Sequence, residues 1–184
     1  RQVVNATGLF VTPGLVDIHA HVYYGTEPEA YLSNGNSSVP PDGFTFRSGV
    51  TTAVDTGSAG PGNFMGFRRH VIEPSQVRIL AYLHVSHAGI YGFSTRVSVG
   101  ESEDIRMMDP QGAAEVADAN RDVIVGIKVR VGRHASGHQG VAPLDIALQV
   151  AEETGLPLMA HIDEPPPTYE DVLARLRPGD VLTH

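Results

Sequence analysis

Short apolar segments alternate with amphipathic helical patterns along almost the whole of this 184-residue sequence. The apolar segments are rich in Val, Ile and Leu and lack a strict apolar–polar alternation, which is typical of parallel strands covered on both faces. A parallel pair of strands needs a crossover connection, and a helix is the usual one. The alternation therefore predicts an α/β protein built from consecutive βα units.

Six strands are predicted, at residues 15–22, 51–56, 79–86, 123–131, 157–162 and 181–184. Helices are predicted between them at residues 63–73, 110–120, 143–154 and 168–177. Asp109 followed by Pro110 is typical of a helix start, and Gly155 is typical of a helix end. Thr168 is predicted to cap the last helix.

This order of elements fits either a doubly wound sheet or a barrel. No glycine-rich phosphate loop follows the first predicted strand, which weakens the dinucleotide-binding form of the doubly wound sheet. A (β/α)8 barrel of the TIM type has eight parallel strands. We therefore predict an incomplete barrel that holds about six of the eight strands.

Charge and composition narrow the classes of partner. The formal net charge of −8 disfavours nucleic acid and anionic membrane surfaces, which bind basic patches. No apolar run approaches the ~20 residues of a membrane-spanning helix, and residues 1–5 lack the apolar core of a signal peptide. We expect a cytoplasmic enzyme with a small-molecule substrate, able to form a homo-oligomer. Because the sequence does not begin with Met, we expect it to belong to a longer protein.

His19 and His21 stand at the end of the first predicted strand. Residues two apart on a strand point to the same side, so both imidazoles can lie together at the carboxyl end, where barrel active sites are found. The sequence has no cysteine, so a transition metal must be held by His, carboxylate or a modified side chain. The pair predicts a metal site, although two polar residues leaving a strand are the simpler alternative. Asp17 can support the pair by hydrogen bonding or be purely structural.

Lys128 lies among β-branched residues on the fourth predicted strand. Burial lowers the pKa of a lysine, and the neutral amine can react with carbon dioxide to give an anionic carbamate whose two oxygens bridge two metal ions. A salt-bridged barrel lysine is the alternative. Two later strands end in histidine, at His161 and His184. Histidines at the ends of strands one, five and six, with lysine on strand four, form the strongest signal in the sequence.

Several segments resemble known enzymes. VTPGLVDIHAH at residues 11–21 resembles the sequence that opens the barrel of amidohydrolases such as dihydroorotases and hydantoinases, and GVTTAVD at 49–55 resembles their second strand. The closer resemblance is to the dihydroorotase-like deacetylase branch of the amidohydrolase superfamily. It rests on DTGSAG at 55–60, GFRR at 66–69, IVGIKVR at 124–130 and HIDEPPP at 161–167. It implies that residues 1–10 are the exit strand of a small β-sandwich, and residues 11–184 a partial metallohydrolase barrel.

The resemblance also implies a cofactor of two divalent metal ions, expected to be zinc, bridged by carbamylated Lys128. The implied ligands are His19, His21, Lys128, His161 and His184. The family's catalytic aspartate lies on the eighth strand, outside this chain. The catalytic residue is therefore unassigned here, and the fragment alone is expected to be inactive.

The function implied is a zinc-dependent hydrolase that cleaves an amide or ester bond of a small carboxylate-bearing substrate, as a deacetylase does, through a metal-bridging hydroxide. A cyclic-amide hydrolase of the dihydroorotase or hydantoinase type would use the same ligands. A mononuclear deaminase would relay protons through Glu164 but has no use for Lys128. A non-catalytic binding barrel would leave the paired histidines unexplained.

Three residues are candidates for substrate binding. Arg130 and Arg96 can each hold a carboxylate through two parallel hydrogen bonds, although both can equally be surface charges. His87, after the third predicted strand, can face the pocket. His84, on that strand, is expected to be packed in the core.

Overall fold

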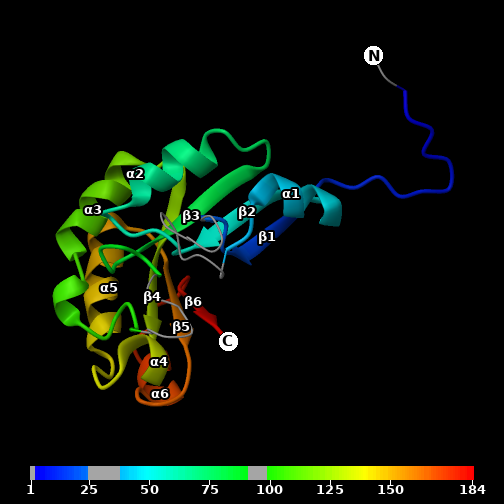
Figure 1. Cartoon of the computed structure of the whole chain (residues 1–184). Coiled ribbons are helices and arrows are strands. Elements are labelled where there is room, and N and C mark those ends of the chain that lie inside the picture. The colour runs from blue at the N-terminus through cyan, green and yellow to red at the C-terminus, as the bar shows by residue number, and fades with distance from the viewer. Residues whose placement is uncertain (1–2, 25–37, 91–98) are drawn as a thin grey trace.

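A computed structural model of the protein describes residues 3–24, 38–90 and 99–184. Within these residues, six parallel strands form one sheet in the order β1-β2-β3-β4-β5-β6 (Figure 1). The strands are β1 (Leu15–Ala20), β2 (Val50–Thr56), β3 (Arg78–His84), β4 (Ile124–Val131), β5 (Leu158–Ile162) and β6 (Val181–Thr183). Each strand pairs with the next in the sequence, without the reversal of order that defines a doubly wound sheet.

The sheet curls so that its two outer strands approach each other. The ring centroids of His19 on β1 and His184, just after β6, lie 5.2 Å apart. In a flat sheet, six strands spaced about 4.8 Å apart would place the outer two about 24 Å from each other. The fold is therefore that of a (β/α)8 barrel of the TIM type, of which the described residues hold six strands, as predicted.

Helices and helical turns connect the strands, and α2, α3 and α5 lie along one side of the sheet (Figure 1). The connecting elements in the described residues are α1 (Pro41–Thr45), the 3-10 turn η2 (Phe46–Ser48), α2 (Phe64–Phe67), the π-helical turn η3 (Arg68–Ile72), the 3-10 turn η4 (Ile105–Met107), α3 (Pro110–Ala119), α4 (Arg133–Ser136), α5 (Ala142–Thr154) and α6 (Tyr169–Leu173). None of the helices in this described part is long and apolar enough to cross a bilayer.

The predicted strands agree with the observed ones to within two residues at each end. The helix signals are also confirmed at three points. The Asp109 carboxylate accepts a hydrogen bond from the Gly112 N–H at 2.9 Å and caps α3, α5 ends at Gly155 with φ 66°, and Thr168 forms a capping box with Asp171.

The predicted length of the last helix is wrong, because α6 ends at Leu173 and does not continue to residue 177. The Asp180 carboxylate accepts a hydrogen bond from the Arg177 N–H at 2.8 Å, which holds the chain in a turn. The same carboxylate accepts a bond from the Leu158 N–H at 2.8 Å and fastens the turn to the start of β5. This side-chain bonding replaces the helical hydrogen bonds at that point.

The two faces of the central strands have different surroundings. On β4, Ile127 and Val129 are fully buried and belong to the apolar core, together with Leu144 and Ala147 of α5. Lys128 and Arg130 alternate with them and therefore point to the opposite, inner face of the sheet. The fold thus places the apolar residues under the helices and the chemistry-bearing residues inside the curl.

The outer strand β1 is less well covered than the central strands. Val16 and Ile18 on its outer face are 57% and 69% exposed. Residues 3–14 form neither helix nor strand and run away from the sheet (Figure 1). The assignment of residues 1–10 to a β-sandwich stays a prediction.

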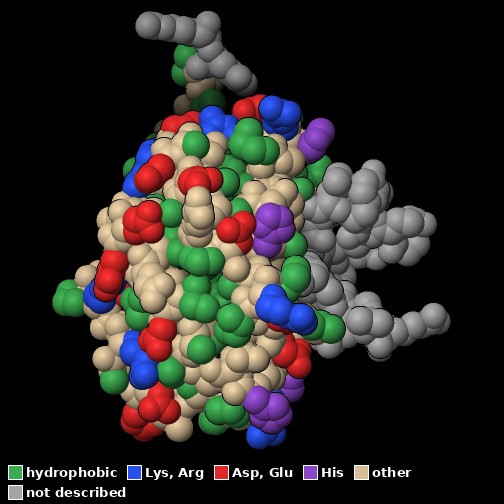
Figure 2. Space-filling model, turned by 90° about the vertical axis from the view of Figure 1, so that its left-hand side faces the viewer, with side chains coloured by type: hydrophobic (Ala, Val, Ile, Leu, Met, Phe, Trp, Pro, Cys, Tyr) green, Lys and Arg blue, Asp and Glu red, His purple; other side chains and the backbone are tan. Residues whose placement is uncertain are grey.

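The helix-covered side has a mixed surface. Figure 2 looks onto this side and shows acidic and basic side chains interspersed, with hydrophobic side chains in small groups between them. The chemistry-bearing side chains lie instead at the inner face and at the carboxyl ends of the strands, where barrels carry their active sites.

Candidate metal centre at the carboxyl ends of the strands

Four predicted ligands come together as one cluster, here called the histidine group and consisting of His19, His21, His161 and His184. The ring centroids of His19 and His21 lie 5.9 Å apart, and those of His161 and His184 lie 4.6 Å apart. The contact between His19 and His184 joins the two pairs. The group exists because three strands end at the same rim and because the sheet curls.

The environment keeps the imidazoles of His19, His21 and His161 neutral at physiological pH. Burial, assisted by the charge of Lys128, lowers the pKa of His19 and of His21 to about 4. Burial, with Arg130 and Lys128, lowers the pKa of His161 to about 2. Neutral imidazole is the form that binds metal ions.

Lys128 is buried on β4, with 1% of its surface exposed. Its Nζ has no hydrogen-bond partner among the residues that the structure describes. Burial and the nearby charge of Arg130 lower the pKa of the amine to about 7. A large share of the amine is therefore neutral at neutral pH, which is the state that reacts with carbon dioxide.

Gly57, just after β2, makes room for the lysine stem. It has φ +89°, and a Cβ there would lie 2.5 Å from the Lys128 Cγ. Any other residue would meet both a backbone penalty and a clash. The sequence resemblance over residues 55–60 thus includes a position whose physical role is to let Lys128 extend along the inner face.

The residues after β2 also orient His21. The Ser58 hydroxyl lies 2.9 Å from His21 Nδ1, which directs the opposite ring nitrogen, Nε2, away from Ser58. The fully buried Asp55 carboxylate accepts hydrogen bonds from the Ser58 and Val22 N–H groups, both at 2.8 Å. Asp55 therefore ties the end of β1 to the end of β2. Asp17 accepts a bond from the His19 N–H at 3.0 Å, a local backbone contact.

The donor set fits a transition metal in its chemistry. Two imidazoles bound to one zinc ion through nitrogens 2.0–2.1 Å away have ring centroids about 5 Å apart, and His161 and His184 lie at 4.6 Å. Within the described residues, no three His, Asp or Glu side chains converge closely enough to hold an ion by themselves. A carbamate on Lys128 would add two oxygen donors that the unmodified amine does not have.

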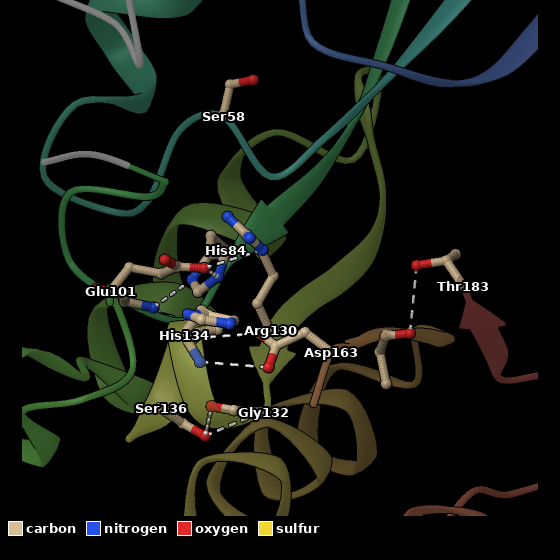
Figure 3. A network of polar contacts seen from close by, with 12 residues as sticks. Ser58, His84, Glu101, Arg130, Gly132, His134, Ser136, Asp163 and Thr183 are labelled. Atoms are coloured by element: carbon tan, nitrogen blue, oxygen red, sulfur yellow. Dashed lines mark hydrogen bonds and ion pairs between the residues drawn. The ribbon is translucent and has the colours of Figure 1, made fainter. Parts of the chain in front are cut away.

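A second polar cluster, which the sequence did not predict, lies beside the histidine group. Glu101 is fully buried, and its Oε1 lies 3.5 Å from His84 Nε2 and 3.4 Å from Arg130 Nε (Figure 3). His84 is buried, as predicted. Glu101 lies in a stretch of sequence without apolar periodicity, so no signal in the sequence pointed to it.

Other predicted site residues lie elsewhere. His87 is 54% exposed in its side chain, and its Nδ1 lies 2.9 Å from Asp109, the cap of α3. Glu164 is 66% exposed in its side chain and lies 3.7 Å from Arg133. Arg96 falls outside the described residues. Of the two substrate-binding candidates within the described residues, Arg130 lies next to the histidine group, where it pairs in register with His161.

Comparisons with known proteins agree with this picture. The model of the amidohydrolase family matches residues 10–178. A protein named Deacetylase Atu3266, from Agrobacterium fabrum, is 39% identical over 183 residues, covering 100% of this chain and 42% of the relative. A deacetylase from Enterococcus faecalis is 30% identical over 178 residues, covering 96% of this chain and 44% of that protein. The chain thus spans about two fifths of the length of these relatives.

Solved structures are similar over nearly the whole chain. A crystal structure of a dihydroorotase is 38% identical with a TM-score of 0.81, covering 96% of this chain and 45% of that one. A crystal structure of an adenine deaminase is 30% identical with a TM-score of 0.80, covering 94% of this chain and 43% of that one. The similar proteins therefore carry three different activity names on one fold.

Proposed function

This chain belongs to the amidohydrolase family, and on that premise we propose that it holds the metal centre of a zinc-dependent hydrolase. The enzyme would cleave an amide or ester bond, as a deacetylase does, in a small molecule that carries a carboxylate. Because the chain covers about two fifths of its relatives, the proposal concerns the full-length protein, with the fragment expected to be inactive alone.

The observation that carries the proposal is the burial of Lys128 beside the histidine group. A buried ammonium without a hydrogen-bond partner is strongly destabilising, so the amine must be neutral or chemically modified. The lowered pKa of about 7 favours the neutral form. A carbamate would bring a negative charge and two oxygens to the place where four imidazoles already meet.

Each residue has a role in this proposal. Bound divalent metal ions would supply hydroxide at neutral pH and polarise the scissile carbonyl. The ions would be held by His19, His21, His161, His184 and carbamylated Lys128. Ser58 would orient the His21 ring, and Arg130 would bind the substrate carboxylate. The group that takes the proton from water is proposed to lie outside this chain.

A cyclic-amide hydrolase is the second candidate, because the dihydroorotase structure is about as similar in sequence as the curated deacetylases. Both reactions attack a carbonyl and would use the same ligands. A mononuclear deaminase that uses Glu164 is less well supported. That side chain lies on the surface against Arg133, and a single-metal site gives Lys128 no role.

The test uses the full-length protein, purified with zinc. Metal analysis should give close to two zinc ions per chain, and growth with 13C-labelled bicarbonate should give a carbamate carbon signal that disappears in Lys128→Met. Turnover should be found among N-acetylated amino acids or O-acetylated hydroxy acids. Turnover only of cyclic ureides would favour the second candidate. One zinc per chain with turnover only of aminated heterocycles would overturn the proposal in favour of a deaminase.

The predicted cytoplasmic location, the possible homo-oligomer and the lack of nucleic-acid or membrane partners stay proposals. They do not affect the proposed ligand assignments, which the metal analysis tests.

A further inference from the structure

The loop after β3 carries a buried acid, Glu101, for which the proposed metal site has no use. Its side chain is 0% exposed. Within the described residues, neither carboxylate oxygen has a hydrogen bond of ordinary length. The groups that face it are His84 Nε2 and Arg130 Nε, at 3.5 and 3.4 Å from the same oxygen. Figure 3 shows the Arg130 side chain running from β4 toward this carboxylate.

The charges within the triad of His84, Glu101 and Arg130 can be assigned from its contacts. The Ser86 N–H donates to His84 Nδ1 at 2.9 Å, so the ring proton lies on Nε2, the nitrogen that faces Glu101. Burial lowers the pKa of His84, which is therefore neutral. Burial tends to raise the pKa of Glu101, but His84 and Arg130 lower it below its ordinary value. The negative charge of Glu101 is thus balanced by Arg130.

The backbone places Glu101 independently of its carboxylate. The Ser102 N–H donates to the Ala135 carbonyl at 3.0 Å, and Gln139 Nε2 donates to the Glu103 carbonyl at 2.9 Å. Gly100 packs so closely that a Cβ would lie 2.2 Å from the Ala135 carbonyl oxygen. Residues 100–103 are therefore held against residues 135–139 by close packing before Glu101 and by two hydrogen bonds after it.

Stability gives no reason for an acid at this position. A buried ion pair has a desolvation penalty that its attraction roughly offsets, so apolar residues of similar size would serve the fold as well. An ion pair at Nε, here 3.4 Å long, favours one orientation of the guanidinium plane, and that plane sets the direction of two parallel hydrogen bonds to a carboxylate. Arg130 is also the register neighbour of His161, at the edge of the histidine group.

We propose that Glu101 is a positioning residue, which holds the guanidinium of Arg130 beside the histidine group in the orientation that binds the substrate carboxylate. His84 completes the arrangement by donating its Nε2 proton toward the same oxygen. The inference rests on the proposed function in one respect, the carboxylate on the substrate. It adds a residue that determines specificity for that carboxylate.

The experiment compares a charged and a neutral substrate in the full-length zinc protein. The pair is N-acetylglycine and N-acetylglycinamide, which differ in the carboxylate alone. In Glu101→Gln, KM for N-acetylglycine should rise about tenfold to a hundredfold, the range for a charged hydrogen bond that is lost, while kcat changes less. The kinetics of N-acetylglycinamide should not change.

Two further variants separate positioning from damage to the loop. Glu103→Gln changes an exposed acid of the same loop and should leave KM for both substrates within about twofold of wild type. In an Arg130→Met background, Glu101→Gln should raise KM for N-acetylglycine by less than about twofold more. The reason is that the effects of two residues that act through one contact are not additive. Should Glu101→Gln fail to fold, Arg130→Lys keeps the charge balance but lacks the planar fork, and should raise KM for N-acetylglycine selectively.

Binding of non-hydrolysable analogues separates this inference from the proposed reaction. N-methylsulfonylglycine and its neutral amide are titrated calorimetrically into wild type and Glu101→Gln. Weaker binding of the charged analogue alone to Glu101→Gln supports the positioning role, even if no acyl substrate is hydrolysed. In that case only the hydrolase proposal fails. Equal weakening of both analogues, an effect that persists in the Arg130→Met background, or no binding of either analogue to wild type overturns the inference.

Discussion

The central strands β3–β5 and the outer strand β1 both carry predicted metal ligands, but their surroundings differ. In the central region, Leu83, Ile127 and Leu158 are each 0% exposed, and the loops after these strands are bonded to one another. Asp163, after β5, accepts hydrogen bonds at 3.2 Å from the N–H groups of His134 and Ala135, both in α4 (Figure 3).

The outer strand β1 has a neighbour on one edge only within the described residues, and the outer face of the strand is largely exposed. Its two histidines are held instead by contacts at the end of β2, through Asp55 and Ser58. The comparison teaches that the site combines a buried, closely packed half, which presents Lys128 and Arg130, with a half whose position depends on a few polar contacts.

The largest effect is expected at the centre of the closely packed half. Lys128→Met in the full-length protein should lower the zinc content, and it should lower kcat/KM by at least about a hundredfold. Loss of a residue that only supports a ligand lowers metal affinity or activity about tenfold to a hundredfold, and loss of a bridging ligand should have a larger effect. The Tm of the metal-free protein should not fall, because methionine removes a buried amine without opening a cavity. A variant that keeps both zinc ions and its activity would contradict the ligand role.

Two isoleucines provide a direct measure of the difference between the regions. Ile127→Ala, at a fully buried position on β4, should lower the free energy of unfolding by about 2–5 kcal/mol. Ile18→Ala on β1, at a position 69% exposed, should lower it by less than about 0.5 kcal/mol. Denaturant titration of both variants is the measurement. Equal losses of unfolding free energy in the two variants would contradict the proposed difference between the regions. They would show that the outer face of β1 is covered in the full-length protein.

Gly57 lies where the two regions meet, and its replacement tests how tightly they are fitted. Gly57→Ala should destabilise the protein by about 2–4 kcal/mol, since the Cβ meets Lys128 and the backbone has a positive φ. Gly155→Ala is the matched control, because it also has a positive φ, +66°, but nothing lies within 4 Å of a Cβ there. Gly155→Ala should lower the free energy of unfolding by only about 1 kcal/mol. Similar losses in the two variants would mean that Lys128 moves aside easily.

The smallest effect concerns the attachment of the other outer strand, β6. Burial tends to raise the pKa of Asp180, but the Arg177 side chain and the Leu158 N–H lower it below its ordinary value of 3.8. A lowered pKa in the folded state stabilises the protein above that value, and the stabilisation is lost as the pH falls through the folded-state pKa. Asp180→Asn should therefore lower the free energy of unfolding by about 1–2 kcal/mol at pH 7. The difference from wild type should shrink when the denaturant titration is repeated near pH 3.

The strands, their order and the positions of the four histidines at the strand ends could be predicted, because each leaves a local pattern, an apolar run that ends in a polar side chain. The end of α6 could not, because it depends on Asp180 bonding to a backbone group of β5. Glu101 could not either, since its role depends on side chains that are distant in sequence and on a loop without periodicity. His87 lies in the predicted loop, but its contact with Asp109 turns it toward the start of α3.

The contact between His19 and His184 also has a consequence for the order of folding. It joins positions near the two ends of the sequence, and contacts of such long range form only after the entropy of closing the intervening chain has been offset by other interactions. The paired site can thus assemble only once the curled sheet is in place. Metal ions added during refolding should leave the early kinetic phases unchanged and be taken up in the last one.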